Sequence, residues 1–167
     1  MIPTRKHLSY ALGYIELNLF PEAREELALI KPEDRETPEV LSIHIELAMA
    51  RSTWTRVITL ATQVTAVIPT LERPWIAWAY ALREKQRVTD ARDVLLRGER
   101  AITEPSPLVD YNLACYYCLL GDLPEARRRL KRACAREPEW KTEAAADPDL
   151  SALNTRDTTC ARDEDGP

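Results

Sequence analysis

Two cysteines separated by two residues, Cys115 and Cys118, have the spacing in this sequence that is most suggestive of chemistry. A thioredoxin-type redox site needs such a pair at the start of a helix that follows a strand, and a structural zinc site needs four ligands. No strand pattern precedes this pair, no second pair of this spacing occurs, and His7 and His44 lie far away in the sequence. We therefore expect reduced, packed thiols and no bound metal or cofactor.

The remaining polar residues do not form a recognisable catalytic motif. The sequence contains no Gly-rich phosphate loop, no nucleophile elbow and no His-Glu-x-x-His helix. His7 and His44 lie in helix-like segments, where a packed or half-exposed histidine is more common than a catalytic one. The sequence therefore predicts a protein that is not an enzyme.

A dense run of positive charge lies between residues 127 and 132. A solvated helix face accounts for it, and the alternative is a patch for an acidic protein surface or for anionic lipid head groups. The candidate residues of this basic patch are Arg127, Arg128, Arg129, Lys131 and Arg132.

Composition and charge restrict the classes of partner. The chain has 167 residues, of which 45% are hydrophobic and 30% charged, with a formal net charge of -4 and a pI near 5.3. This balance is typical of a globular protein and gives no electrostatic reason to expect nucleic acid as a partner. No apolar run approaches the roughly 18 residues needed to span a bilayer, and the first residues lack the continuous apolar core of a signal peptide. We expect a cytoplasmic protein.

The segment 111–138 has the clearest internal pattern, YNLACYYCLLGDLPEARRRLKRACAREP. Its key positions are Leu113-Ala114, Tyr117, Gly121-Asp122, Ala126, Leu130, Ala133 and Pro138. This order resembles the tetratricopeptide signature, in which a Leu-Gly pair precedes an aromatic residue, Gly-Asp, Ala, a large apolar residue, Ala and Pro. Alanine replaces the first glycine of the signature and keeps that position small.

The same pattern recurs at intervals of 34, 34 and 35 residues. The small position of the second helix recurs as Ala23, Val57, Ala91 and Ala126, and that of the first helix as Ala11, Ile45, Ala79 and Ala114. We therefore predict a tetratricopeptide domain over residues 1–154. Its four hairpins cover about 4–37, 38–71, 72–106 and 107–138, a capping helix covers 139–154, and a disordered polar tail covers 155–167.

Physical reasons support an all-α fold. Small residues on both helices of a hairpin let the helix axes approach to about 8–10 Å. One hairpin cannot bury its whole apolar face, so successive hairpins must stack. The family resemblance implies a right-handed superhelical solenoid.

The resemblance also implies where a ligand binds, since the first helices of tetratricopeptide hairpins line a concave groove. An apolar groove with a few charges suits an amphipathic helix or an apolar peptide, although the chain's own cap could fill part of it. The predicted protein-binding residues are Leu8, Leu12, Ile15, Met49, Arg73, Ile76, Tyr80, Arg83, Leu108 and Tyr111; the same register places Glu46, Cys115 and Cys118 on this face.

These observations predict a non-enzymatic scaffold that binds a peptide, helix or protein surface in the groove. Leu12 stands where chaperone-tail clamps of the family carry asparagine, which argues against that subtype. The chain is also similar in size and style to the bacterial kinesin light chains, which accompany bacterial tubulin filaments. The alternative is therefore an adaptor that associates with such a filament, or links it to a membrane, through the basic patch. Self-association through the ends of the solenoid is a further open alternative.

Overall fold

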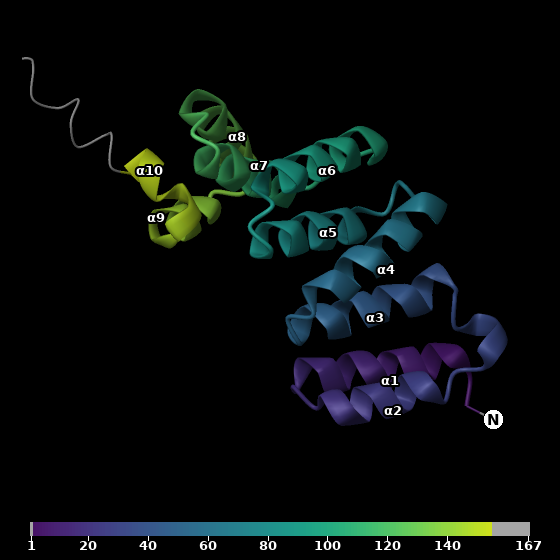
Figure 1. Ribbon diagram of the computed structural model, residues 1–167. Coiled ribbons are helices and arrows are strands. Elements are labelled where there is room, and N and C mark those ends of the chain that lie inside the picture. Colours follow the sequence, from purple (N-terminus) through teal and green to yellow (C-terminus); the bar gives the residue numbers. More distant parts are fainter. Residues whose placement is uncertain (1, 155–167) are drawn as a thin grey trace, which may run out of the picture. The chain divides into compact units, whose positions relative to one another are not determined.

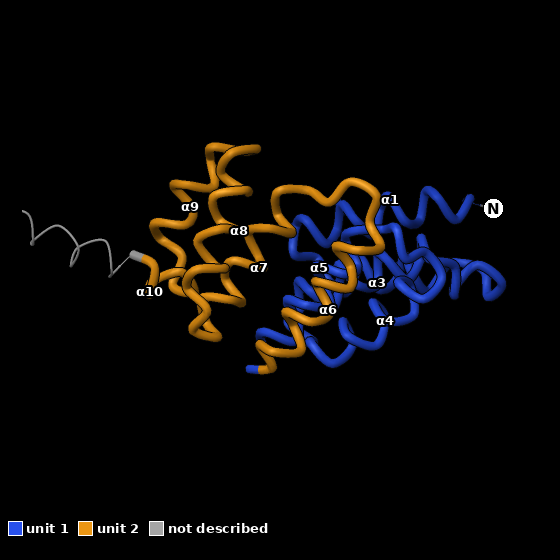
Figure 2. The backbone as a smooth tube through the Cα atoms, turned by 90° about the horizontal axis from the view of Figure 1, so that it is seen from above, with its two compact units in different colours: residues 1–86 blue, residues 87–167 orange. Residues whose placement is uncertain are grey.

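The computed structural model describes residues 2–154, in which every regular element is a helix. The all-α prediction is thus confirmed, while the predicted tail, 155–167, lies outside the described residues. The chain divides into two compact units, residues 1–86 and 87–167 (Figure 2). The division falls within the third predicted hairpin, between its two helices.

The first unit holds two helical hairpins and a fifth helix (Figure 1). α1 (Thr4–Glu16) pairs with α2 (Phe20–Ala28), and α3 (Pro38–Ala50) pairs with α4 (Trp54–Val67). A short 3-10 turn, η1 (Pro32–Asp34), joins the hairpins, and α5 (Glu72–Glu84) packs on α3 and α4. The first helices α1, α3 and α5 therefore lie side by side.

The second unit begins with α6 (Val88–Ala101), which packs on α7 (Pro107–Leu119). α7 forms a hairpin with α8 (Leu123–Arg136). The chain then continues through α9 (Trp140–Ala146), the 3-10 turn η2 (Pro148–Leu150) and α10 (Ser151–Asn154). We call residues 140–154 the cap segment. Proline in the first turn of α7 and α8 is compatible with helix, because the N–H that it lacks would have no intrahelical partner there.

The small positions of the repeat lie in the core, as the crossing argument requires. The positions occupied by alanine or valine, one on each helix from α1 to α8 except α3, are all fully buried, and Ile45 on α3 is 1% exposed. In the first unit, α3 contributes to two apolar clusters. Val40 and Leu47 pack with the α1–α2 hairpin, whereas Ile45 and Ala48 pack with α4 and α5. One helix thus joins the two hairpins, which is how stacked repeats share a core.

Each hairpin turn contains one residue with a left-handed backbone conformation. These residues are Asn18, Ser52, Gln86 and Gly121, with φ of 59°, 53°, 62° and 84°. In three turns the next amide donates to a carbonyl five residues earlier, as from Thr53 to Ala48 at 2.9 Å, which is the Schellman closure of a helix end. Glycine is the residue best suited to this conformation, and only the fourth turn has it.

Candidate functional site

In the first unit, the predicted groove residues divide into core and surface. Ile15 and Ile76 are 8% and 6% exposed and belong to the interior. Leu12 and Tyr80 are 38% and 40% exposed, and Leu8, Met49 and Arg83 are half-buried. The structure therefore presents a narrower apolar surface than the sequence register predicts. We define the first-helix face by its accessible members, Leu8, Leu12, Glu46, Met49, Arg73 and Tyr80.

An ion pair crosses this face from α3 to α5. Arg73 donates two hydrogen bonds to Glu46, Nε to Oε1 at 2.7 Å and Nη2 to Oε2 at 2.8 Å. The hydrogen bond to Glu46 raises the pKa of Arg73 above its ordinary value, against desolvation. The Arg73 side chain is 52% exposed, so solvent screens the pair and its net stabilisation is at most about 1 kcal/mol. The pair is better suited to orienting charges on this face than to holding the fold.

Tyr80, one of the two tyrosines predicted as groove residues, contacts the neighbouring hairpin. Its ring meets Trp54, the first residue of α4, edge to face with centroids 5.7 Å apart. Arg83, one turn further along α5, is joined to the adjacent Glu84 at 2.7 Å. Tyr80 is thus held in place by an aromatic neighbour while much of its surface stays accessible.

In the second unit, the equivalent face of α7 is covered by the cap segment. Tyr111 is 7% exposed, its ring lies 4.6 Å from that of Trp140, and its hydroxyl donates to Asp147 Oδ2 at 2.8 Å. Burial and this carboxylate raise the pKa of Tyr111, so the hydroxyl keeps its proton. Leu108, in the first turn of α7, is half-buried. Of the two alternatives for Tyr111, the structure shows the one in which the chain's own cap occupies the site.

The Cys115–Cys118 pair lies under the same cap. Both thiols are buried, and Cys115 Sγ lies 3.6 Å from Asp147 Oδ2. Burial, and then the negative charge of Asp147, raise the pKa of Cys115, which disfavours the reactive thiolate. Both are free thiols, and the described residues contain no group of three or more His, Cys, Asp and Glu that could hold a metal. Both cysteines lie on α7, and neither side chain faces solvent.

Three of the five residues of the predicted basic patch, Arg128, Arg129 and Arg132, form ion pairs with carboxylates of the chain. Arg129 is only 6% exposed, whereas the sequence places it on a solvated face; it donates to Asp110 Oδ1 at 2.9 Å and to both carboxylate oxygens of Glu99. Its Nε also donates to Glu125 at 3.1 Å. Burial lowers the pKa of Arg129, but the hydrogen bonds to Glu99 and Asp110 raise it more, so Arg129 stays charged. This residue is a buried link between α6, α7 and α8.

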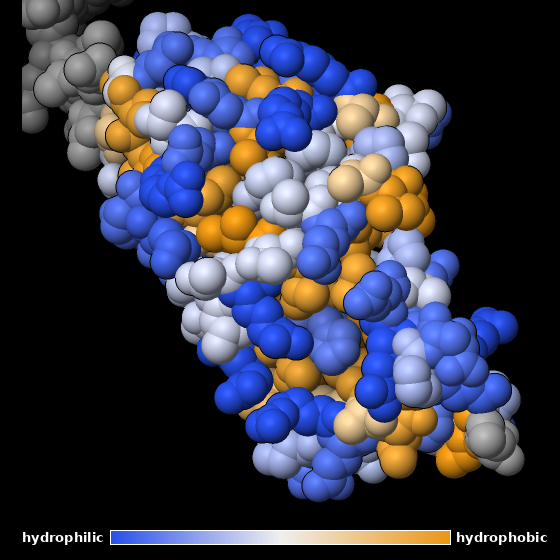
Figure 3. Space-filling view, turned by 45° about the vertical axis from the view of Figure 1, so that its right-hand side comes forward, coloured by the Kyte–Doolittle hydropathy of each residue, from blue (hydrophilic) through white to orange (hydrophobic). Residues whose placement is uncertain are grey.

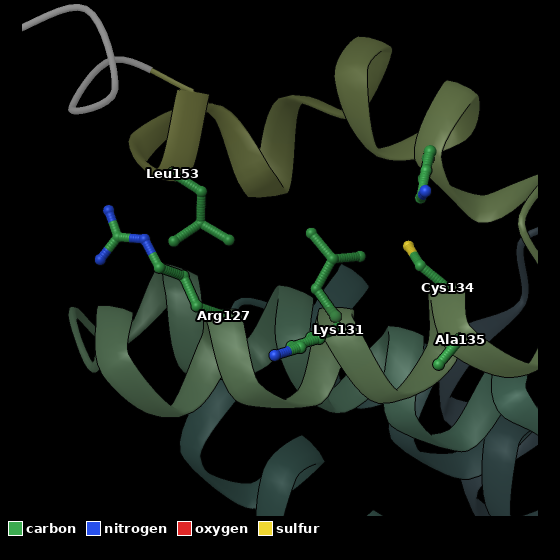
Figure 4. Close-up of a pocket in the computed structure, with 7 residues that line it drawn as sticks. Arg127, Lys131, Cys134, Ala135 and Leu153 are labelled. Atoms are coloured by element: carbon green, nitrogen blue, oxygen red, sulfur yellow. The ribbon is translucent and has the colours of Figure 1, made fainter. Parts of the chain in front are cut away.

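The other members of the basic patch differ in their surroundings. Arg128 pairs with Glu125, and Arg132 lies 3.3 Å from Asp110 Oδ2. Arg127 and Lys131 line a hollow of about 450 Å³ between α8 and the cap segment, with Lys141 on its far side. Figure 4 shows Leu153 and Cys134 pointing into this hollow from opposite walls. The five residues therefore do not form one continuous cationic surface.

Several residues of these arrangements were not among the sequence candidates, and Asp110 and Asp147 are the most informative of them. Asp110 is 3% exposed and carries no motif signal, although a carboxylate within an otherwise apolar helix suggests a buried partner. Asp147 accepts from the backbone N–H of Asp149 as well as from Tyr111, so it both begins η2 and fixes the cap on α7. Only its position before Pro148 indicated a helix start.

On the side of the molecule seen in Figure 3, hydrophobic side chains are interrupted by hydrophilic ones. No helix among residues 2–154 is long and apolar enough to cross a membrane.

Paired helices, small residues at each crossing and a left-handed residue in each turn together make a helical-repeat fold of the tetratricopeptide type. Comparison with solved structures agrees. A thermophilic TPR protein of Thermus thermophilus, TTC0263, aligns with a TM-score of 0.71 at 15% identity, over 90% of this chain and 81% of that chain. MamA (MSR-1 C2) aligns with a TM-score of 0.66, also at 15% identity, over 83% of this chain and 79% of that chain.

At this level of identity the likeness establishes the fold. No protein-family model matches the sequence, and no curated protein matches it in sequence.

Proposed function

We propose that this chain is a non-enzymatic protein-interaction scaffold, which binds a helical or extended segment of a partner protein on the first-helix face. The observation that carries the proposal is the cap segment on α7. It occupies, in the second unit, the register positions that form the first-helix face in the first unit. The molecule thus contains one example of a segment bound at these positions.

The cap contact indicates what such a face recognises. An aromatic ring of the segment packs at a tilt against a tyrosine of α7, and one carboxylate of the segment accepts a hydrogen bond from the same tyrosine. The ring contact is non-polar and the carboxylate contact is directional, so together they favour an amphipathic segment.

The first unit provides comparable groups in an uncovered form. Leu12 and Tyr80 are the accessible large side chains, and the Glu46–Arg73 pair lies on the helices that carry Met49 and Tyr80. A partner segment with apolar residues at helical spacing would bury the apolar side chains. A carboxylate of that segment would share Arg73 with Glu46. Because tyrosine and arginine often dominate interface energies, Tyr80 and Arg73 would contribute most to binding.

The test is an affinity capture from the lysate of the native host with wild type, Leu12→Ala/Tyr80→Ala and a matched control, Leu17→Ala/Leu29→Ala. The control removes two leucines that are 69% and 64% exposed and lie outside the first-helix face. All three proteins are first compared for helicity and melting temperature. We expect a captured protein to be retained by the control and lost by the first-helix variant. Equal capture by both variants would refute the proposed surface.

A further inference from the structure

One pocket of the first unit is lined by residues that do not belong to the first-helix face. It has a volume of about 600 Å³ and is enclosed by the second half of α2, the end of α3, the start of α4 and the loop after η1. Its apolar wall consists of Leu27 and Ala28 from α2 and Leu47 and Ala48 from α3. The polar residues that line it are Arg24, Arg35, His44, Arg51, Thr53 and Arg56.

Four arginines thus line one pocket, and no aspartate or glutamate among the described residues lines it. Arg35 is anchored by the end of α2, since Nε donates to the carbonyl of Ile30 at 2.8 Å and Nη2 to that of Ala28 at 2.9 Å. Within the described part of the chain, the side chains of Arg24, Arg51 and Arg56 form no ion pair and no hydrogen bond. An arginine always carries its charge, so this pocket holds an excess of positive charge that the protein does not neutralise.

His44 responds to this environment. Burial lowers its pKa below the ordinary value of 6.5, and the positive charge of Arg56 lowers it further. The imidazole is therefore neutral at pH 7 and can donate one hydrogen bond without adding to the repulsion.

The type of anion follows from the number and geometry of the donors. Guanidinium groups bind carboxylate and phosphate oxygens in a bidentate fork, and bonds between charged partners are about twice as strong as neutral ones. A carboxylate carries one charge and two oxygens, whereas a terminal phosphoryl group carries up to two charges and three acceptor oxygens. Four arginines that line one pocket and lack acidic partners therefore match a phosphoryl group better than a single carboxylate.

From these contacts we propose that the pocket of Arg24, Arg35, Arg51 and Arg56 binds the phosphoryl group of a small soluble phosphate compound. The apolar wall formed by α2 and α3 receives the non-polar part of an organic phosphate. This site is independent of the first-helix face, so either can be correct without the other.

The test is isothermal titration calorimetry at constant ionic strength with four probes: inorganic phosphate, pyrophosphate, phenyl phosphate and, as the acidic-protein alternative, a polyglutamate peptide. The proteins are wild type, Arg51→Gln/Arg56→Gln and the control Arg5→Gln. All three arginines are exposed, so the fold should be unaffected, and Arg5 lies outside the pocket. Proton NMR of the histidine rings locates the site, because the chain has only His7 and His44.

We expect saturable binding of at least one phosphate probe, a shift of the His44 ring resonance with little change at His7, and a loss of affinity of about tenfold or more in the double variant only. Tighter binding of phenyl phosphate than of inorganic phosphate would assign the apolar wall to an organic ligand, and the reverse order would assign the site to free phosphate. The proposal is overturned if no probe binds, or if both variants bind equally well. It is also overturned if only a polyglutamate peptide binds, which would assign the pocket to an acidic protein.

Discussion

Replacing Arg129 by methionine tests whether the basic run of α8 is structural. Methionine keeps most of the side-chain length and removes the guanidinium that joins Glu99, Asp110 and Glu125. Asp110, which is 3% exposed, would keep only the more distant contact with Arg132. Removing one partner of a buried ion pair typically costs about 3–5 kcal/mol, because a charge is left buried without compensation. The remaining contact of Asp110 places the expected loss near the lower limit, about 3 kcal/mol.

That loss is large for this unit. A unit of about 80 residues has a total stability of roughly 4–12 kcal/mol, and each kcal/mol lowers the melting temperature by about 4–8 °C at this size. The assay is urea unfolding followed by helical circular dichroism. Arg128→Met on the same helix is the control, because Arg128 is 57% exposed and, within the described residues, pairs only with Glu125; solvent screens this pair, so its loss should change the stability little.

A compensating variant separates charge burial from packing. Arg129→Met/Asp110→Leu removes both central charges, so we expect it to recover at least half of the loss of the single variant. If Arg129→Met and Arg128→Met unfold within about 0.5 kcal/mol of each other, which is the usual additivity error, the buried-link interpretation of Arg129 is refuted.

Three further predictions concern the turns, the ion pairs and the cap. An added Cβ meets no atom within 4 Å at either Gly121 or Gly13, so the backbone conformation alone decides the effect of alanine on stability. At φ of +84°, Gly121→Ala should destabilise the protein by about 1–2 kcal/mol, because this conformation disfavours a side chain. Gly13→Ala within α1 should stabilise it by about 0.5–1 kcal/mol, and urea unfolding measures both changes. The hydrogen bond from Arg128 lowers the pKa of Glu125 below its ordinary value of 4.5. The stabilisation by ionised Glu125 is therefore complete above that value and is lost as pH falls through the lower pKa of the folded state. In Glu125→Gln the stability should fall less steeply on acidification than in wild type, and an identical dependence of stability on pH in both proteins would contradict the prediction. Asp147→Ala should loosen the cap, so a thiol reagent should label the buried thiols of α7 faster than in wild type, with the labelling of Cys134 as the reference. If the variant and wild type are labelled at the same rate, Asp147 does not hold the cap.

The sequence predicts local structure well here because few interactions determine it. The small residues at the crossings recur at a fixed interval, and any larger side chain on both helices would separate their axes. The helices of all four predicted hairpins are accordingly present. Non-glycine residues such as Ser52 and Gln86 gave no sign of a left-handed turn, because only tertiary closure of the hairpin forces that conformation on them.

Side-chain environments were less predictable, since they depend on residues that are distant in sequence. A run of arginines suggests a solvated helix face, and nothing within α8 shows that Glu99 and Asp110 neutralise Arg129. The family register likewise selects Tyr111 as a groove residue, but the fate of that ring depends on where the cap segment docks. The register gives the position of Tyr111 on its helix, but it carries no information about which segment packs against that position.

The four left-handed turn residues also provide a means of measurement. They recur once per hairpin, all four are exposed, and none belongs to either proposed binding site. Asn18→Gly, Ser52→Gly or Gln86→Gly would strengthen one hairpin at a time without altering the chemistry of the proposed sites. In such a series each variant changes the stability of one hairpin. Hydrogen exchange on each variant, with and without a candidate ligand, would then report which hairpin the ligand protects. The left-handed turn residues thereby make it possible to assign a partner's binding position to one hairpin of the chain.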